Sequence, residues 1–325
     1  TQPAGQGAER LMAHPGRDIR EERLRALLKD MIDIYSPSGK EDDIADFLCA
    51  YLDGMGFDVE SQAVEKTRRN VIVAGDENAP LLLLGHIDTV SAPDFDHYGF
   101  EEEEGMVYGL GAADMKGGCA AMIEALCAFR EHGGAPLSAT LALVVGEEET
   151  GDGVAAFLED YHCPWAIVAE PTGLRPCFSH YGYLEFLLNA SGKRVHASQA
   201  SGEDNAVFSM LSALLRIAAH CREKRSDVIF NIRDLTSAHA GFAVPDRCEA
   251  WIDLHVPPLF PMEELIFEIE DITRGFSRSG ANSRIEIACT TVHHGYSLPE
   301  KGLLADVLKG VFDARGMEWE SGAFV

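Results

Sequence analysis

The first segment that could do chemistry is Gly85-His86-Ile87-Asp88-Thr89, which follows an apolar run at Leu81 to Leu84. Residues two apart in an extended chain point to the same side, so His86 and Asp88 could act together. The imidazole would bind a metal ion, and the carboxylate would orient it or bridge nearby. Taken alone, the segment fits a hydrogen-bonded loop histidine better, because a His-x-Asp pair often arises by chance.

A second segment, Asp114-Met115-Lys116-Gly117-Gly118, precedes a helix that we expect to start near Cys119. An aspartate at the start of a helix is usually only a cap for the free backbone N–H groups. Metal binding is the alternative role of Asp114. The segment alone does not decide between the two.

Glutamates supply the remaining candidates. Glu147, Glu148 and Glu149 follow the apolar run Leu141 to Val145, and Glu170 follows the run Ala166 to Ala169. A solvated charged turn is the ordinary explanation of such a glutamate run, and a simple strand end would explain Glu170. A bound cation is the alternative, because it would relieve the repulsion between adjacent carboxylates.

The surrounding pattern predicts an α/β fold. Short apolar runs typical of buried strands alternate with helical stretches, which indicates a largely parallel mixed sheet flanked by helices. The expected strands are Val71 to Ala74, Leu81 to Leu84, Leu141 to Val145 and Ala166 to Ala169, and the helices between them are Cys119 to Arg130 and Val154 to Leu158.

Placement links the motifs. Three of the four follow a predicted strand, and α/β sheets keep their binding crevice at the carboxyl ends of the strands. The helix headed by Asp114 could return to the same edge. One imidazole and several carboxylates meeting there would suit zinc-like metals, and a further carboxylate could be the general base on a metal-bound water.

An earlier helix is expected from Ser38, with Ser38 as its cap and Glu41 three positions on, as in a capping box. Gly54 ends it. The segment Pro171 to Tyr183 reads as a hinge because it is rich in proline, glycine and aromatic residues.

Beyond the hinge the order of elements is β-α-β-β-α-β, a ferredoxin-like unit. The last helix, Leu303 to Phe312, is expected to return to the first domain. We therefore expect residues 1–182 with 293–325 to form one domain, and 183–292 to form a smaller domain inserted into it. The chain length of 325 residues favours two domains.

The amino-acid composition argues against some classes of binding partner. The formal net charge is -26, from 27 Lys plus Arg against 53 Asp plus Glu, which disfavours nucleic acid and anionic membranes as partners. No apolar run reaches the ~20 residues of a spanning helix, and Thr1 to Arg20 contains no signal-peptide pattern. The eight cysteines are scattered, which predicts reduced thiols and a cytoplasmic protein.

The chain resembles the M20 metallopeptidases, a family of deacylases and peptidases. The motifs are GHIDTV, GAADMKGG, EEETG and EPT, in family order, and the resemblance runs from about Ile19 to the last residue. It implies a catalytic α/β domain with an inserted ferredoxin-like lid. It also implies a homodimer made through the lid.

The resemblance implies two divalent metal ions, with zinc expected and cobalt as the alternative. His86 would bind one metal together with Glu170, Asp114 would bridge both metals, and Glu149 would bind the second. The family supplies a last histidine ligand, which we expect beyond residue 325.

The register of the glutamate run follows from Gly151, which matches the glycine of the family motif. Glu148 then falls at the general base and Glu149 at the ligand of the second metal, while Glu147 falls at a further acidic position. Asp88 would not bind a metal itself but would support the ligands that do.

In the expected lid, His196 resembles the histidine that reaches a neighbouring subunit's site and holds the oxyanion. Two positions depart from the family. Phe242 stands where an asparagine usually contacts substrate, and His255 stands where an arginine often grips the substrate carboxylate. His255 is thus the candidate substrate-binding residue.

These features predict a hydrolase that cleaves an amide bond of an N-acyl amino acid or small peptide. An aminopeptidase or dipeptidase on the same scaffold is one alternative. The other is a catalytically silent member that only binds metal or ligand.

Overall fold

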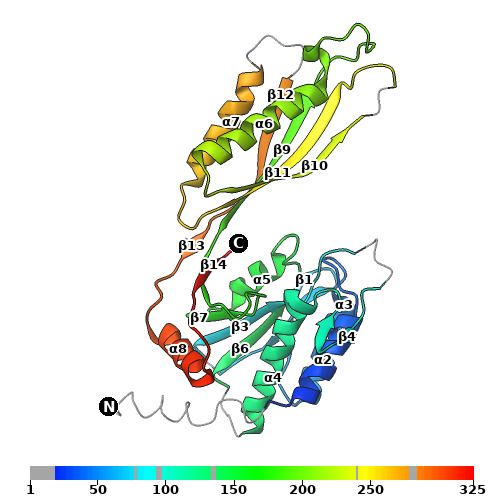
Figure 1. The fold of residues 1–325 in the computed structure, drawn as a ribbon. Coiled ribbons are helices and arrows are strands. Elements are labelled where there is room, and N and C mark those ends of the chain that lie inside the picture. The colour runs from blue at the N-terminus through cyan, green and yellow to red at the C-terminus, as the bar shows by residue number, and fades with distance from the viewer. Residues whose placement is uncertain (1–18, 77–78, 93–96, 133–136, 239–240, 278–283) are drawn as a thin grey trace. The chain divides into compact units, whose positions relative to one another are not determined.

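The computed structural model describes residues 19–325 except 77–78, 93–96, 133–136, 239–240 and 278–283 (Figure 1). Most of the segment Thr1 to Arg20 therefore lies outside the described residues. The chain divides into two compact units. Unit 1 comprises the residues up to Leu174 together with Leu303–Met317, and unit 2 comprises Arg175–Gly302 with Glu318–Val325.

Unit 1 is built on a five-stranded sheet in the order β1-β2-β6-β3-β7. The strands are β1 (Glu60–Glu65), β2 (Arg68–Val73), β3 (Leu81–His86), β6 (Ala139–Val144) and β7 (Trp165–Val168). β3 runs parallel to β6 and to β7, whereas β2 is antiparallel to both β1 and β6.

The sheet is mixed, as predicted, but only the pairings of β3 with β6 and with β7 are parallel. β1 was not predicted from the sequence, since most of its residues are polar and exposed. Only Lys66 and Thr67 separate β1 from β2, and so short a connection can join only antiparallel strands.

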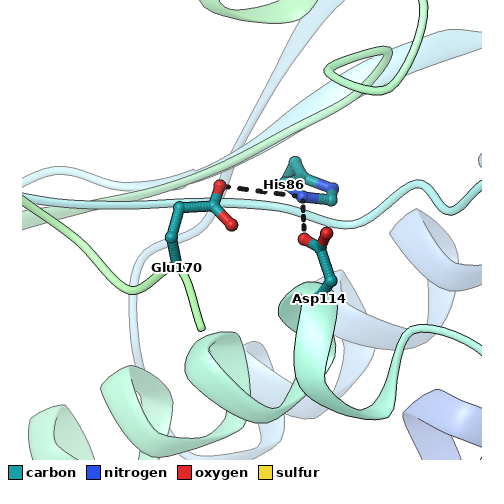
Figure 2. Close-up of side chains that lie close together, drawn as sticks. All are labelled: His86, Asp114 and Glu170. Carbon is teal, nitrogen blue, oxygen red and sulfur yellow. Dashed lines mark hydrogen bonds and ion pairs between the residues drawn. The ribbon is translucent and has the colours of Figure 1, made fainter. Parts of the chain in front are cut away.

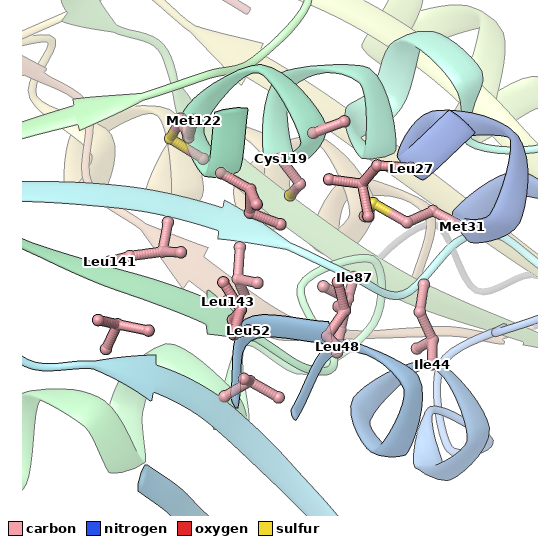
Figure 3. Packing of buried hydrophobic residues seen from close by; sticks show 14 of the residues in the cluster. Leu27, Met31, Ile44, Leu48, Leu52, Ile87, Cys119, Met122, Leu141 and Leu143 are labelled. Atoms are coloured by element: carbon pink, nitrogen blue, oxygen red, sulfur yellow. The ribbon is translucent and has the colours of Figure 1, made fainter. Parts of the chain in front are cut away.

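Helices lie on both faces of this sheet. The helices of unit 1 are α2 (Glu21–Asp33), α3 (Asp42–Gly54), α4 (Gly117–Glu131), α5 (Asp152–Asp160) and α8 (Leu303–Arg315). Residues of α2, α3 and α4 form one apolar cluster with alternate residues of β2 and β6. The intervening residues of these two strands point to the opposite face, where they form a second cluster with Phe157 of α5. Figure 3 shows Leu27, Leu48 and Leu141 in the larger cluster.

Helix α3 begins later than expected. Its first residue is Asp42, and the side chain of Ser38 donates a hydrogen bond of 2.6 Å to the Asp88 carboxylate instead of capping the helix. Glu41 precedes the helix, but its buried carboxylate accepts hydrogen bonds from Arg68. The predicted capping box is therefore wrong, because both of its side chains have partners elsewhere. The helix ends at Gly54, as predicted.

Unit 2 contains two sheets. Its elements are β8 (Cys177–His180), β9 (Gly182–Ser191), η2 (Gly202–Asp204), α6 (Ala206–Lys224), β10 (Ile229–Ser237), β11 (Arg247–Val256), α7 (Met262–Ser277), β12 (Arg284–His293), β13 (Tyr296–Ser297) and β14 (Gly322–Phe324). The four-stranded sheet has the order β10-β11-β9-β12, with all neighbours antiparallel. The observed order of elements from β9 to β12 is β-α-β-β-α-β.

The second sheet of unit 2 has the order β13-β8-β14. In the sequence, β8 precedes the strands of the larger sheet, whereas β13 and β14 follow them. Unit 2 thus extends beyond residues 183–292 in both directions. Residues of α6 and α7 pack with one face of the larger sheet in a separate apolar cluster that includes Phe186, Leu214 and Leu265.

Two further observations concern the chain as described. No helix in this part of the chain is long and apolar enough to cross a membrane. All eight cysteines lie within the described residues, and all are free thiols.

Candidate metal centre

Segments from three strands meet at one edge of the sheet in unit 1. His86 is the last residue of β3, the residues 146–151 follow β6, and Glu170 follows β7. We call residues 146–151 the glutamate turn. β3 lies between β6 and β7 and is parallel to both. Because parallel strands end at the same edge, all three segments are brought together there.

Asp114 reaches this edge from the start of α4. It lies in η1 (Ala112–Lys116), a short helical turn that leads into α4. The approach is close, because a Cβ on Gly118 would lie only 2.2 Å from the carbonyl oxygen of Ala169. A larger residue at this position would push the start of α4 away from the segment that carries Glu170.

Three predicted metal ligands converge at this edge (Figure 2). His86 Nε2 lies 3.1 Å from Asp114 Oδ1 and 3.8 Å from Glu170 Oε1. One possible ligand atom from each residue lies within 4.8 Å of the other two. In the described part of the chain, this is the only group of three or more His, Cys, Asp or Glu side chains that could hold a metal ion.

The ring of His86 is oriented for this role. Its Nδ1 lies 3.0 Å from the carbonyl oxygen of Asp88, and a carbonyl oxygen can only accept, so Nδ1 carries the proton. Nε2 is the nitrogen that faces Asp114, and on loss of its proton it would offer its lone pair to a metal ion. The imidazole is buried, which holds this orientation.

Negative charge is crowded at this edge. Burial lowers the pKa of His86, but hydrogen bonds with Asp114 and Asp88 outweigh it and raise that pKa to about 11. Burial, together with the charges of Asp114 and Glu147, raises the pKa of Glu170 to about 7. Burial also raises the pKa of Glu148. The carboxylates thus need a positive charge beside them.

The donor set fits a divalent metal ion. One imidazole nitrogen and two carboxylate oxygens are ligands that zinc-like metals accept, and a cation among them would offset the crowded negative charge. Side chains of His86, Asp114 and Glu170 would hold it.

The carboxylate of Asp88 fixes the glutamate turn by accepting hydrogen bonds from the backbone of the turn. Its Oδ1 accepts the N–H of Glu147 at 3.1 Å, and its Oδ2 accepts the N–H of Glu148 at 3.0 Å. The hydroxyl of Ser38 donates to the same Oδ2, and Oδ1 lies 3.5 Å from His86 Nδ1. Asp88 is fully buried, so it holds the turn, the histidine and the Ser38 segment together.

The three glutamates of the turn differ in their places. Glu147 Oε2 lies 3.8 Å from His86 Nε2, a proximity that the sequence did not indicate. Glu148 is half-buried, and the charges of Asp114 and His86 act on its carboxyl group. Glu149 is exposed and lies outside the group of His86, Asp114 and Glu170, so its role as a ligand remains a prediction.

Comparison with known proteins adds the family. Residues 82–318 match the peptidase family M20/M25/M40. The chain belongs to this family. The M20 family is metal-dependent, in agreement with the His86, Asp114 and Glu170 group.

Curated relatives of the M20 chain include two deacylases. It is 30% identical over 197 residues to a probable succinyl-diaminopimelate desuccinylase from Staphylococcus aureus, covering 57% of this chain and 49% of the relative. It is 32% identical over 229 residues to the acetylornithine deacetylase of Pasteurella multocida, covering 65% and 59%. The chain therefore spans about half of the length of these relatives.

Solved structures share the fold of this chain. A tripeptidase from Staphylococcus aureus superposes with a TM-score of 0.76 at 18% identity, covering 95% of this chain and 85% of that one. Human carnosine dipeptidase 1 gives a TM-score of 0.75 at 14% identity, covering 98% and 88%. At these identities the likeness shows the fold alone.

The remaining predicted M20 site residues belong to unit 2. His196 is exposed, and its Nδ1 lies 2.8 Å from the Ser198 hydroxyl. His255 Nε2 lies 3.4 Å from Asp253 Oδ2, and Phe242 is 86% exposed. The candidate metal ligands all belong to unit 1, so the roles of His196 and His255 stay predictions.

Proposed function

We propose that the protein hydrolyses an amide bond of an N-acyl amino acid or small peptide. The observation that carries the proposal is the convergence of His86, Asp114 and Glu170 beside a glutamate turn in an M20-family chain. The relatives named as a desuccinylase and a deacetylase support amide hydrolysis as the reaction. We further propose two divalent ions, zinc in the first instance and cobalt as the alternative, with Asp114 shared between them and Glu149 as one ligand of the second.

Bound ions of this kind polarise a carbonyl group and lower the pKa of water. His86, Asp114 and Glu170 would hold such an ion, and the hydrogen bond from His86 Nδ1 to the carbonyl of Asp88 leaves Nε2 as the nitrogen that would bind it. Glu148 is the general base: its carboxylate takes a proton from the attacking water and passes it to the leaving amine. His196 is retained as the candidate donor to the oxyanion.

Substrate choice is proposed from two positions in unit 2. His255 replaces the usual arginine, and imidazole is a poorer clamp for a carboxylate than guanidinium. Phe242 presents apolar surface where an amide is usual. We therefore propose weak activity on acetylornithine and succinyl-diaminopimelate, and a preference for a more apolar group.

The proposed assembly is a homodimer in which the four-stranded sheet of unit 2, the proposed lid, pairs with its copy in a second chain. β10 is an edge strand, and edge strands often pair across a two-fold axis. Large apolar side chains are exposed on β10 and on the neighbouring α6. They are Phe208, Leu211, Leu215, Ile229, Ile232 and Leu235. The cytoplasm remains the proposed compartment.

A panel of N-acyl amino acids and dipeptides, assayed with added zinc or cobalt, tests the reaction. We expect turnover that His86→Ala abolishes and that His162→Ala, an exposed histidine of the same unit, leaves intact. Preference for dipeptides would instead support the peptidase alternative. Stoichiometric metal without turnover of any panel member would support a silent binding protein and reject the proposal.

A further inference from the structure

Both ends of the glutamate turn contact one strand, β2. Arg68 and Asn70 stand two residues apart on β2, so their side chains point to the same side of the strand. Each side chain lies against a residue at the entrance of the turn and also bonds to a residue at the start of α5, where the turn ends.

Asn70 is fully buried and uses its whole amide group. Its Oδ1 accepts the N–H of Val145, the residue before the turn, at 3.2 Å. Its Nδ2 donates to the carbonyl of Gly153 after the turn and to Gln62 Oε1, both at 2.8 Å. One side chain therefore spans the base of the turn.

Arg68 joins the first residue of α5, directly after the turn, to Glu41, the residue before α3. Its guanidinium donates to Asp152 Oδ1 at 3.1 Å and to the buried Glu41 Oε1 at 2.9 Å. It also lies against the first residue of the turn, since a Cβ on Gly146 would stand 2.4 Å from Arg68 Nη2. Only glycine fits there, because Gly146 also has a φ of +73°.

The turn itself is closed by one carbonyl. Gly146 O accepts the N–H of Thr150 at 3.0 Å and that of Gly151 at 2.7 Å. A turn closed in this way moves largely as one piece, so the position of its ends sets where the glutamates lie. Asp88 holds its middle, and β2 holds its base.

We propose that Arg68 and Asn70 are positioning residues that fix the glutamate turn, and with it the backbone of Glu147, Glu148 and Glu149, beside the candidate metal centre. Their catalytic consequence rests on the proposed function, whereas their hold on the turn does not. Lysine cannot replace Arg68, because an ammonium group lacks the planar fork that reaches Glu41 and Asp152 together.

Arg68→Lys tests the proposal, with Arg23→Lys as its matched control. Arg23 forms an equally buried ion pair with Glu124 elsewhere in unit 1, with side-chain exposures of 15% and 1% against 11% and 0% for Arg68 and Glu41. Hydrogen exchange of the amides in residues 145–153 is the first readout. We expect at least tenfold faster exchange in Arg68→Lys and no change in Arg23→Lys.

Kinetics are the second readout. We expect kcat of Arg68→Lys to fall roughly 10- to 100-fold, as for other residues behind a metal centre, with KM little changed. Unchanged exchange in residues 145–153, or the same acceleration in Arg23→Lys, would overturn the proposal. A wild-type protein without amidase activity would reject the proposed function, while the exchange data would still decide the role of Arg68.

Asp152→Asn gives an independent variant if Arg68→Lys does not fold. It keeps the shape of the side chain, removes its charge, and replaces one of the two oxygens that accept from Arg68 with an NH2 group that cannot accept; Asp152 lies partly at the surface. The same faster exchange in residues 145–153 is expected. Exchange equal to that of wild type would contradict the positioning role.

Discussion

Ser38 and Asp88 are joined by a hydrogen bond of 2.6 Å between a hydroxyl and a buried carboxylate. The same Asp88 oxygen accepts the N–H of Glu148. The segment before α3 therefore takes part in holding the glutamate turn.

Ser38→Ala should loosen this arrangement without unfolding the protein. A hydrogen bond to a charged group contributes about 1.5–3 kcal/mol, so a measurable loss of unfolding free energy is expected, together with a lower kcat. Ser36→Ala is the control, since the Ser36 hydroxyl donates to the Ile87 carbonyl and not to Asp88. Equal losses of kcat in both variants would show that Asp88 is not the cause.

Glu148→Gln should keep the bound metal but lose most turnover. A general base contributes roughly 10²–10⁴-fold, and the amide cannot accept the proton. Glu149→Gln should instead lower the metal content, measured by elemental analysis of the purified protein. Exchanged phenotypes would place the register of the glutamate run off by one.

Gly118→Ala should separate Asp114 from Glu170 and lower the metal content. The new Cβ would meet the carbonyl oxygen of Ala169. Gly54→Ala, at the end of α3 with open space around it, serves as the control. Full metal occupancy in Gly118→Ala would mean that the backbone shifts without moving the ligands.

Leu215→Glu should convert a dimer into a monomer in analytical ultracentrifugation. Leu215 is 70% exposed on α6, where a charge would have to be buried in the proposed interface. Leu158→Glu, on a comparably exposed leucine of α5, should leave the dimer intact. A wild-type protein that is monomeric at all concentrations would remove this assembly.

Acid should destabilise unit 2 through Glu268. The hydrogen bond from Arg225 lowers the pKa of Glu268 to about 2, from 4.5. A lowered folded-state pKa adds stability above the unfolded value, and this is lost as pH falls from about 4.5 towards 2. Urea unfolding at several pH values should show a flatter acid dependence in Glu268→Gln. Glu286→Gln, from an exposed ion pair, should keep the wild-type slope.

The convergence of His86 and Glu170 was predictable from the sequence, because apolar runs mark strands whose carboxyl ends share an edge. For Asp114 the strand pattern left the position open, and its place came from the resemblance to the family. β1 was missed because its alternation carries few apolar residues. Its absence from the prediction also hid the antiparallel half of the sheet.

Long-range partners of polar residues were not predictable. The spacing of Ser38 and Glu41 matches a capping box, and nothing local reveals that their partners are Asp88 and Arg68. Arg68 and Asn70 lack any motif, since their significance arises only when β2 packs beside β6.

The split of unit 1 along the sequence bears on how the protein is made. Unit 1 needs Leu303–Met317, whereas most of unit 2 is the continuous stretch Arg175–Gly302. Arg175–Gly302 separates the two parts of unit 1 in the sequence. At about 5–20 residues per second, the ribosome takes on the order of ten seconds to synthesise this stretch. The buried apolar core of unit 2 uses residues from Leu184 to Ile285, so it can form before α8 has been synthesised. The core of unit 2 can thus be in place while unit 1 still lacks α8.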